Sequence, residues 1–243
     1  MNSEKFSFHL LKEDNKSRLG VINTHRGKID TPTFMPVGTQ GTIKSVFMDD
    51  VIQTGSQIIL CNTYHLMLRP GAERVARLGG VGRMMSWPGP VLTDSGGFQV
   101  WSLAKTRRIT EEGVTFRSPV DGSEIFLGPE ESIDVQQKLG SDIAMAFDEC
   151  TTYPTSRDEA KSSMERSMRW AARCRSAHTL STQALFGIAQ GGVYRDLRER
   201  SLKCLVEIGF DGYALGGLSV GESKQEMRYV LDRVVPAMPI NQP

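Results

Sequence analysis

Four short blocks combine acidic or amide side chains with glycine, and each follows an apolar, strand-like stretch. They are Thr93-Asp94-Ser95-Gly96-Gly97-Phe98-Gln99, Phe147-Asp148-Glu149-Cys150, Gln190-Gly191-Gly192 and Gly216-Gly217-Leu218-Ser219-Val220-Gly221-Glu222. Carboxylates accept hydrogen bonds or protons, amides donate hydrogen bonds, and glycine lets a ligand approach the backbone. If the strands are parallel, the blocks gather at the carboxyl edge of one sheet, where β/α folds keep their chemistry. We therefore predict one composite site at that edge.

Strand-like and helix-like segments alternate along the chain and would position these blocks. Strands are predicted at 32–39, 57–64, 91–93, 142–147, 184–189 and 212–215, and helices at 43–53, 71–78, 129–139, 156–176, 196–208 and 223–234. This alternation implies parallel strands with right-handed crossovers. Before the helix at 129–139, two strand-like runs at 114–116 and 124–126 flank Asp121-Gly122, which predicts an inserted β-hairpin.

The predicted fold class is α/β, with about six β/α units. A closed (β/α)₈ barrel needs eight such units, so either the sheet is open or the sequence is a piece of a longer protein. No low-complexity linker separates a second domain. We therefore expect residues 1–243 to form a single barrel domain, the N-terminal portion of a longer catalytic domain.

Composition narrows the functional class. The formal net charge of +1 provides no overall basic field, so a nucleic-acid partner would need a local patch. The four cysteines form no C-x-x-C pair, which argues against a disulfide framework or a zinc knuckle and fits a reducing cytosol. The first residues lack the apolar core of a signal peptide, and no apolar run is long enough to span a membrane. We expect a soluble, cytoplasmic protein.

In the four blocks, and in Thr31-Pro32-Thr33-Phe34-Met35-Pro36-Val37-Gly38-Thr39 and Asn62-Thr63-Tyr64-His65-Leu66, the chain resembles the tRNA-guanine transglycosylase (queuine tRNA-ribosyltransferase) family. The resemblance implies an irregular (β/α)₈ barrel of the TIM type, with an inserted β-hairpin and incomplete at the C-terminus. It implies exchange of the wobble guanine in a tRNA anticodon loop for a deazaguanine base, in queuosine biosynthesis. Val220 resembles the bacterial branch, whose members use 7-aminomethyl-7-deazaguanine. No redox or nucleotide cofactor takes part, and full-length members are expected to be homodimers.

By the same resemblance, Asp94 is the proton acceptor of the reaction. The expected substrate-binding residues are Asp94, Ser95, Gly96, Gly97, Phe98, Asp148, Gln190, Gly217 and Leu218. The Asp148 carboxylate would accept both N1–H and the exocyclic amine of the base. Gln190 and the backbone N–H of Gly217 would donate to O6, the carbonyl of Leu218 would accept from the aminomethyl group, and Phe98 would stack on the flipped base. Glu222 would orient the Gly217–Leu218 peptide.

The family's reaction is a double displacement through a covalent ribosyl-enzyme, with the logic of a retaining glycosidase. Its nucleophile is a second aspartate, in a Gly-Val-Gly-Thr-Pro-Asp-like segment, and its zinc ligands are three cysteines and a histidine further on. Neither segment occurs in the 243 residues. We therefore expect no metal ligands in this chain, and no normal exchange activity from it alone.

Each feature also has a simpler interpretation. Taken alone, Asp94-Ser95-Gly96-Gly97 is more often a turn with a capping aspartate, and the glycine blocks could be phosphate-binding loops. A lone His65 in an apolar context is more often structural. Two neighbouring carboxylates would raise the pKa of Cys150, which predicts a pocket wall rather than a nucleophile.

Two basic segments could contact RNA. Arg107-Arg108 follows the third predicted strand and is the better candidate for a tRNA contact, whereas the arginines of the helix at 156–176 are interpreted as a solvated face with interspersed acidic residues. Two competing functions remain at this stage: a non-catalytic tRNA-binding partner subunit of the same family, and an unrelated phosphate-binding barrel enzyme.

Overall fold

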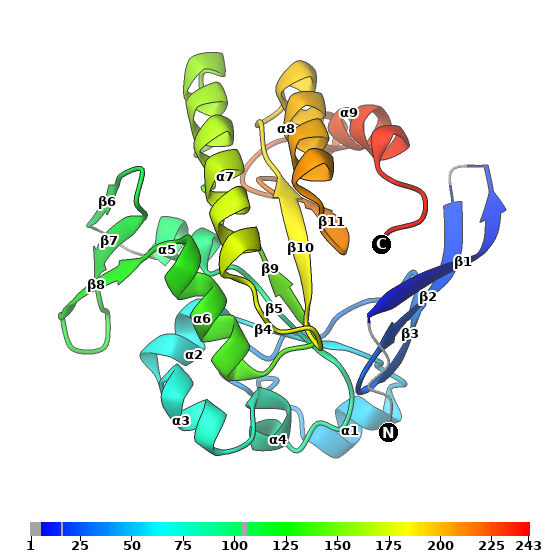
Figure 1. Cartoon of the computed structure of the whole chain (residues 1–243), viewed down its shortest axis with the longest axis vertical. Coiled ribbons are helices and arrows are strands. Elements are labelled where there is room, and N and C mark those ends of the chain that lie inside the picture. Colours follow the sequence, from blue (N-terminus) through cyan, green and yellow to red (C-terminus); the bar gives the residue numbers. More distant parts are fainter. Residues whose placement is uncertain (1–5, 16, 104–105) are drawn as a thin grey trace.

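The computed structural model describes residues 6–15, 17–103 and 106–243. At its centre lies a parallel sheet whose strand order follows chain order (Figure 1). Its strands are β4 (Ile59–Cys61), β5 (Val91–Thr93), β9 (Ile143–Met145), β10 (Ala184–Ala189) and β11 (Gly212–Leu215). In the described part of the chain β4 and β11 are the two edges and do not pair with each other, so the sheet is open. The α/β class with parallel strands is confirmed, and a closed barrel is not formed.

Helices connect the strands and pack on the sheet. They are α1 (Met48–Gln53), α2 (Thr63–Leu68), α3 (Ala72–Arg77), α4 (Val81–Met85), α5 (Gly97–Leu103), α6 (Pro129–Leu139), α7 (Arg157–Ala177), α8 (Arg195–Ile208), α9 (Lys224–Val234) and a short 3₁₀ helix (Val235–Ala237). The longer helices have clear boundary signals. Ser156 and Ser223 form capping boxes at the starts of α7 and α9, and Gly140 ends α6 in the left-handed conformation. None of the described helices has both the length and the apolar character needed to span a bilayer.

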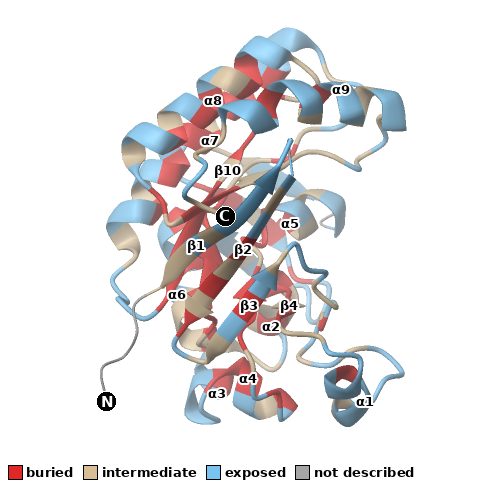
Figure 2. Cartoon of the chain, turned by 90° about the vertical axis from the view of Figure 1, so that its right-hand side faces the viewer, coloured by how far each residue is buried: buried red, intermediate tan, exposed pale blue. Residues whose placement is uncertain are grey.

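The core lies between the sheet and the helices that cover it. Every residue of β5 and β9 is buried, which explains why these strands are continuously apolar rather than alternating. On one side, Ile133 of α6, Trp170 of α7 and Leu202 of α8 belong to one buried cluster with Leu185 of β10. Figure 2 shows buried residues concentrated in the central strands and on the inner faces of these helices.

An antiparallel sheet precedes the β/α units, and the sequence analysis did not predict it. It consists of β1 (Ser7–Asp14), β2 (Ser17–Thr24) and β3 (Gly27–Thr31). Its inner residues Ile22 and Ile29 pack in one buried cluster with Ile58, Ile143 and Phe186 of the central region. Buried and less buried residues alternate in the second half of β2, but the amino acids there do not alternate between apolar and polar, so residues 17–24 carry no clear strand signal.

The predicted hairpin insertion is confirmed. β7 (Val114–Arg117) pairs with β8 (Glu124–Leu127), and the turn between them contains Gly122 at φ 76°. A third strand, β6 (Arg107–Ile109), pairs with β7 and was not predicted.

Most other element predictions are confirmed. The elements at 129–139, 184–189 and 212–215 begin and end at the predicted residues. The predicted strand at 32–39 is wrong: this segment makes only an isolated bridge, between Val37 and Leu60. Pro32 and Pro36 have no N–H to give to a ladder, which explains the failure. The helix predicted at 43–53 begins only at Met48, since Ser45 adopts a positive φ of 63° that no helix continues through.

Candidate functional site

The carboxylate of Asp148 lies where three strand ends meet. Oδ1 accepts a hydrogen bond from Ser95 Oγ at 2.8 Å, and Oδ2 accepts one from Gln190 Nε2 at 2.6 Å. Ser95 follows β5, Asp148 follows β9 and Gln190 follows β10, so three of the four blocks are in direct contact. The fourth is adjacent, because a Cβ added to Gly216 would lie 3.2 Å from Asp148 Oδ2. The structure thus brings these predicted site residues together.

Glycines let the elements of the site pack closely around this carboxylate. A Cβ on Gly217, which has φ 60°, would lie 2.6 Å from Gln190 Oε1. A Cβ on Gly97 would collide with the Asp148 carbonyl and lie 3.2 Å from Asp148 Oδ1. Gly96 adopts φ 83°, a conformation that side chains disfavour. Glycine is therefore required at these positions, because a larger residue would push Asp148 and Gln190 out of place.

The carboxylate of Asp94 is held by a second set of donors. Oδ1 accepts from the backbone N–H of Thr63 at 2.8 Å, and Oδ2 accepts from Asn62 Nδ2 and, at 2.8 Å, from Gln99 Nε2. The roles of Asn62 and Gln99 were missed, although Asn62 directly follows β4 as Asp94 follows β5. The repeated polar residue after a strand was the signal that could have identified it.

Both carboxyl groups favour protonation more than an exposed aspartate does. Burial raises the pKa of Asp94, and its hydrogen bonds from Asn62, Thr63 and Gln99 only partly offset this. Burial also raises the pKa of Asp148; the bonds from Gln190 and Ser95 lower it, and the negative charge of Asp94 raises it further. Two shielded, mutually repelling carboxyls are an arrangement suited to acid–base chemistry.

The remaining predicted contact residues lie around this centre. The ring of Phe98 is 46% exposed and packs against Trp101 in α5, with ring centroids 5.5 Å apart. Leu218 is half-buried. Glu222 does not contact the Gly217–Leu218 peptide in the predicted way: its carboxylate accepts from the next two backbone N–H groups, those of Ser219 and Val220. Burial opposes ionisation of Glu222, but these backbone donors together lower its pKa.

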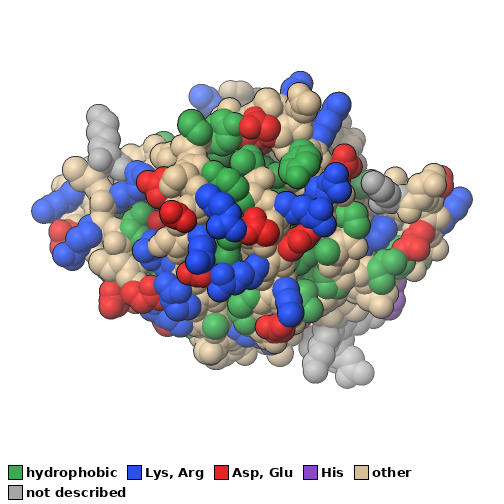
Figure 3. Space-filling view, turned by 90° about the horizontal axis from the view of Figure 1, so that it is seen from above, with side chains coloured by type: hydrophobic (Ala, Val, Ile, Leu, Met, Phe, Trp, Pro, Cys, Tyr) green, Lys and Arg blue, Asp and Glu red, His purple; other side chains and the backbone are tan. Residues whose placement is uncertain are grey.

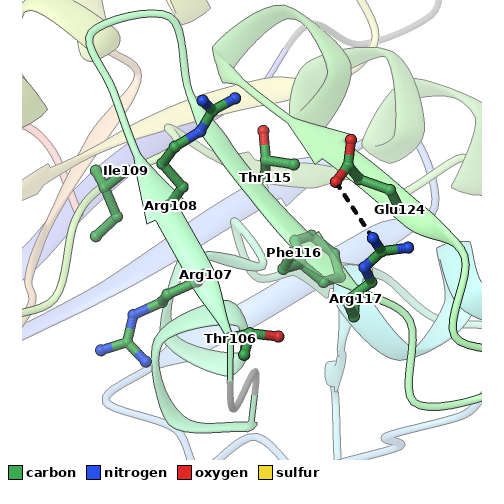
Figure 4. A pocket seen from close by; sticks show the side chains of 8 residues that line it. All are labelled: Thr106, Arg107, Arg108, Ile109, Thr115, Phe116, Arg117 and Glu124. Carbon is green, nitrogen blue, oxygen red and sulfur yellow. Dashed lines mark ion pairs between the residues drawn. The ribbon is translucent and has the colours of Figure 1, made fainter.

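The two candidate RNA-contact residues lie on the inserted sheet. Figure 4 shows Arg107 and Arg108 on β6, beside Phe116 of β7 and the ion pair between Arg117 and Glu124. Both arginines are exposed. Arg107 also donates to the Trp101 carbonyl at 2.7 Å and lines a second hollow with Trp101, Glu149 and Cys150, next to Asp148. Their contact with RNA stays a prediction.

The arginines of α7 join this helix to the inserted sheet. Arg169 makes a two-pronged contact with the Glu111 carboxylate, at 2.5 and 2.8 Å, and Arg173 donates to the carbonyls of Glu111 and Glu112. These partners lie outside α7. The prediction of a solvated helix face with interspersed acidic residues did not include them. On the face seen from the top of Figure 1, basic and acidic side chains are intermixed (Figure 3).

The environments of the Cys150 thiol and the His65 imidazole are typical of structural rather than reactive groups. Burial, followed by the charge of Asp148, raises the pKa of Cys150 to about 12, so a thiolate is disfavoured there. His65 packs edge-on against Tyr64, and burial lowers its pKa. Within the described residues, His, Cys, Asp and Glu do not gather in a group of three that could hold a metal ion. The residues present therefore do not supply the ligand set expected for zinc in longer family members.

One buried cation was missed altogether. Arg198 is fully buried in the first turn of α8, and Ser201, on the same face, accepts the backbone N–H of Gln190 at 3.0 Å. Its spacing from Ser201, Leu202 and Leu205 places it on the buried face of the helix. A cation at that register was the signal in the sequence.

Comparisons with known proteins identify the family of the chain. A family model described as "Queuine tRNA-ribosyltransferase" matches residues 14–243. Relatives carrying that name include one from Hydrogenovibrio crunogenus, 57% identical over 236 residues, and one from Thioalkalivibrio sulfidiphilus, 58% identical over 236 residues. Each alignment covers 97% of this chain and 64% of the relative. One from Pseudomonas aeruginosa is 59% identical over 237 residues, with 98% and 64% covered. The chain thus spans about 64% of the length of these relatives.

Proposed function

The chain belongs to the queuine tRNA-ribosyltransferase family, and from that premise we propose that it carries the base pocket of a tRNA-guanine transglycosylase. The pocket takes guanine from the wobble position of a tRNA anticodon loop and exchanges it for 7-aminomethyl-7-deazaguanine, in the queuosine pathway of the cytoplasm. No redox or nucleotide cofactor is part of this proposal. The zinc ion, the homodimer and the completed (β/α)₈ barrel are proposed for the longer members of the family.

The observation that carries the proposal is the setting of the Asp148 carboxylate. Each of its oxygens already accepts one side-chain hydrogen bond, from Ser95 or from Gln190, and each can accept another. Guanine and 7-deazaguanines present two adjacent donors, N1–H and the exocyclic amine, which match the two oxygens of a carboxylate. Gly217 lies against the Gln190 amide, so its N–H and that amide can converge on O6 of the same base.

Asp94 is proposed as the proton acceptor. Three donors fix its carboxylate, and its raised pKa makes it a better proton acceptor than an exposed aspartate. The C1′ nucleophile belongs to a Gly-Val-Gly-Thr-Pro-Asp-like segment that is not among the 243 residues. Base binding, rather than base exchange, is therefore the activity to measure on this chain.

The test is a calorimetric titration of 7-aminomethyl-7-deazaguanine into the 243-residue chain and into Asp148→Ala. We expect saturable one-to-one binding by the first. We expect at least a roughly hundredfold loss in the second, because two charge-assisted hydrogen bonds disappear. No binding by an unchanged chain that melts cooperatively would contradict the proposal.

Two controls separate the competing functions. Inorganic phosphate, titrated in the same way, should give no heat of binding; binding of phosphate but not of the base would favour a phosphate-binding enzyme. A tRNA-binding subunit without a base pocket would bind tRNA equally well before and after Asp148→Ala and would bind the free base in neither form.

A further inference from the structure

Arg198 connects the ends of two strands through backbone carbonyls. Within the described part of the chain its guanidinium donates to the carbonyl oxygens of Gly192 at 2.7 Å, Ala189 at 2.8 Å, Gly216 at 2.6 Å and Gly217 at 3.4 Å. These carbonyls belong to the end of β10, the glycine turn that follows it, and the turn after β11. One side chain from α8 thus fixes two of the four blocks relative to each other.

Holding two loops through a buried cation costs free energy. A fully buried cation loses its hydration, and here carbonyl dipoles compensate for that loss in place of a carboxylate at bonding distance. Burial lowers the pKa of Arg198 to about 10, opposed by the negative charge of Glu222, so the group stays charged at neutral pH. A buried charge retained at such a cost calls for a role beyond packing.

The peptide unit that Arg198 holds points to that role. The carbonyl of Gly216 and the N–H of Gly217 belong to one planar peptide, so fixing the carbonyl fixes the direction of the N–H. A cation bonded to the carbonyl oxygen also polarises the peptide and strengthens its N–H as a donor. Under the proposed function, this N–H donates to O6 of the base. Arg198 also bonds the Ala189 carbonyl, which shares a peptide with the N–H of Gln190.

We propose that Arg198 is a positioning residue for recognition of the six-position oxygen of the base. It acts through the Gly216–Gly217 peptide and does not touch the base itself. The inference rests on the proposed function and deepens it, since it assigns the discrimination of a 6-oxopurine to a residue of α8.

The test compares two ligands in the 243-residue chain, in Arg198→Lys and in Arg198→Met. Guanine has the six-position oxygen, whereas 6-thioguanine keeps both N1–H and the exocyclic amine but has sulfur, a weaker hydrogen-bond acceptor, at that position. Lysine keeps the charge but not the planar fork that reaches several carbonyls at once. The matched control is Arg195→Met in the same helix, because Arg195 is exposed and forms an ion pair with Glu199 on the surface of α8. Thermal melting is recorded for every variant.

We expect Arg198→Lys to weaken guanine binding by about tenfold or more, and 6-thioguanine binding by less than about threefold. Arg195→Met should change neither. Equal losses for both ligands, unchanged guanine affinity, or failure of both Arg198 variants to melt cooperatively would each overturn the positioning role and leave Arg198 a structural residue. Absence of guanine binding by the unchanged, folded chain would be a different result, because it would remove the proposed function and this inference together.

Discussion

At the scale of single residues, the two carboxyls of the site differ in how many hydrogen bonds they already accept. Asp94 accepts from a backbone N–H and two amides, and its second oxygen already has two donors. Asp148 accepts one donor on each oxygen, so it keeps a free acceptor direction on both. Asp148 is therefore the carboxyl that can accept hydrogen bonds from a ligand with two adjacent donors.

The raised pKa of Asp148 predicts that base affinity depends on pH. Burial is the main reason for the shift, and a protonated carboxyl has lost one of the two acceptors that the base needs. Affinity for 7-aminomethyl-7-deazaguanine, measured from about pH 8 to about pH 4, should therefore fall as the pH is lowered, and the fall should begin above the ordinary aspartate pKa of about 3.9. Calorimetry in buffers of different ionisation enthalpy should show a proton released on binding at the acidic end. Affinity that is constant over this range would contradict the assignment.

The same group should affect stability in the opposite direction. A raised folded pKa means that the folded state holds the proton more tightly, so the stability contributed by Asp148 is fully present below its unfolded pKa and is lost as the pH rises through the folded pKa. Asp148→Asn removes this titration. Its stability relative to the unchanged chain should therefore increase with pH across the same range, as measured by urea unfolding.

At the scale of elements, α7 determines where the inserted sheet lies. Trp170 is fully buried, stacks on Phe147, and donates from Nε1 to the Glu111 carbonyl at 2.7 Å. The Glu111 side chain, by contrast, pairs with Arg169 where both are about half exposed. Buried and exposed contacts to the same residue thus anchor the turn between β6 and β7.

These two contacts should differ greatly in how much they contribute to the free energy of unfolding. Trp170→Phe leaves a cavity and removes a buried donor, and should cost about 2 kcal/mol or more of unfolding free energy. Glu111→Gln removes an exposed ion pair and should cost less than about 1 kcal/mol. Urea unfolding measures both, and hydrogen exchange should increase first in 107–117 for Trp170→Phe. Equal costs would mean that the exposed pair, not the buried indole, anchors the insertion.

The elements that could be predicted from sequence are those with local signals. α6 has Pro129 at its start and Gly140 at its end, and β10 is a continuous apolar run. The segment at 32–39 is also apolar, but its prolines remove the donors that a strand needs. Its apolar character therefore led to a wrong strand prediction. Among site residues, Asp148 was predictable from its block. The burial of Arg198 could have been predicted from its register on α8, but the carbonyls that it binds are chosen by tertiary packing and leave no local signature.

At the scale of the whole molecule, the antiparallel sheet packs against the central one through a shared apolar cluster. Ile29 is fully buried there with Ile58 and Phe186, whereas Leu11 on β1 is 62% exposed. Ile58 precedes β4 and Phe186 lies in the middle of β10, so these two partners of Ile29 are not at the carboxyl ends of the strands, where Asp148 lies. The contact should therefore contribute stability without shaping the pocket.

Ile29→Ala should lower the unfolding free energy by about 2–5 kcal/mol, because a buried side chain is replaced by a cavity. Leu11→Ala, the exposed counterpart in the same sheet, should stay within about 0.5 kcal/mol. Urea unfolding measures both, and base affinity at a temperature where Ile29→Ala is folded should equal that of the unchanged chain. A selective loss of base affinity in folded Ile29→Ala would show that the two sheets are coupled to the pocket.

The strand order, which follows chain order, also bears on how the molecule is made. A ribosome releases the chain from its N-terminus, so each parallel strand emerges after the neighbour it pairs with. The hydrogen bonds of the site bridge 32 residues between Asn62 and Asp94, 53 between Ser95 and Asp148, and 42 between Asp148 and Gln190. Its parts therefore appear in sequence during synthesis, and the turn at Gly217 comes last. A nascent chain can build the scaffold progressively, yet it has no complete pocket until that final turn has left the ribosome.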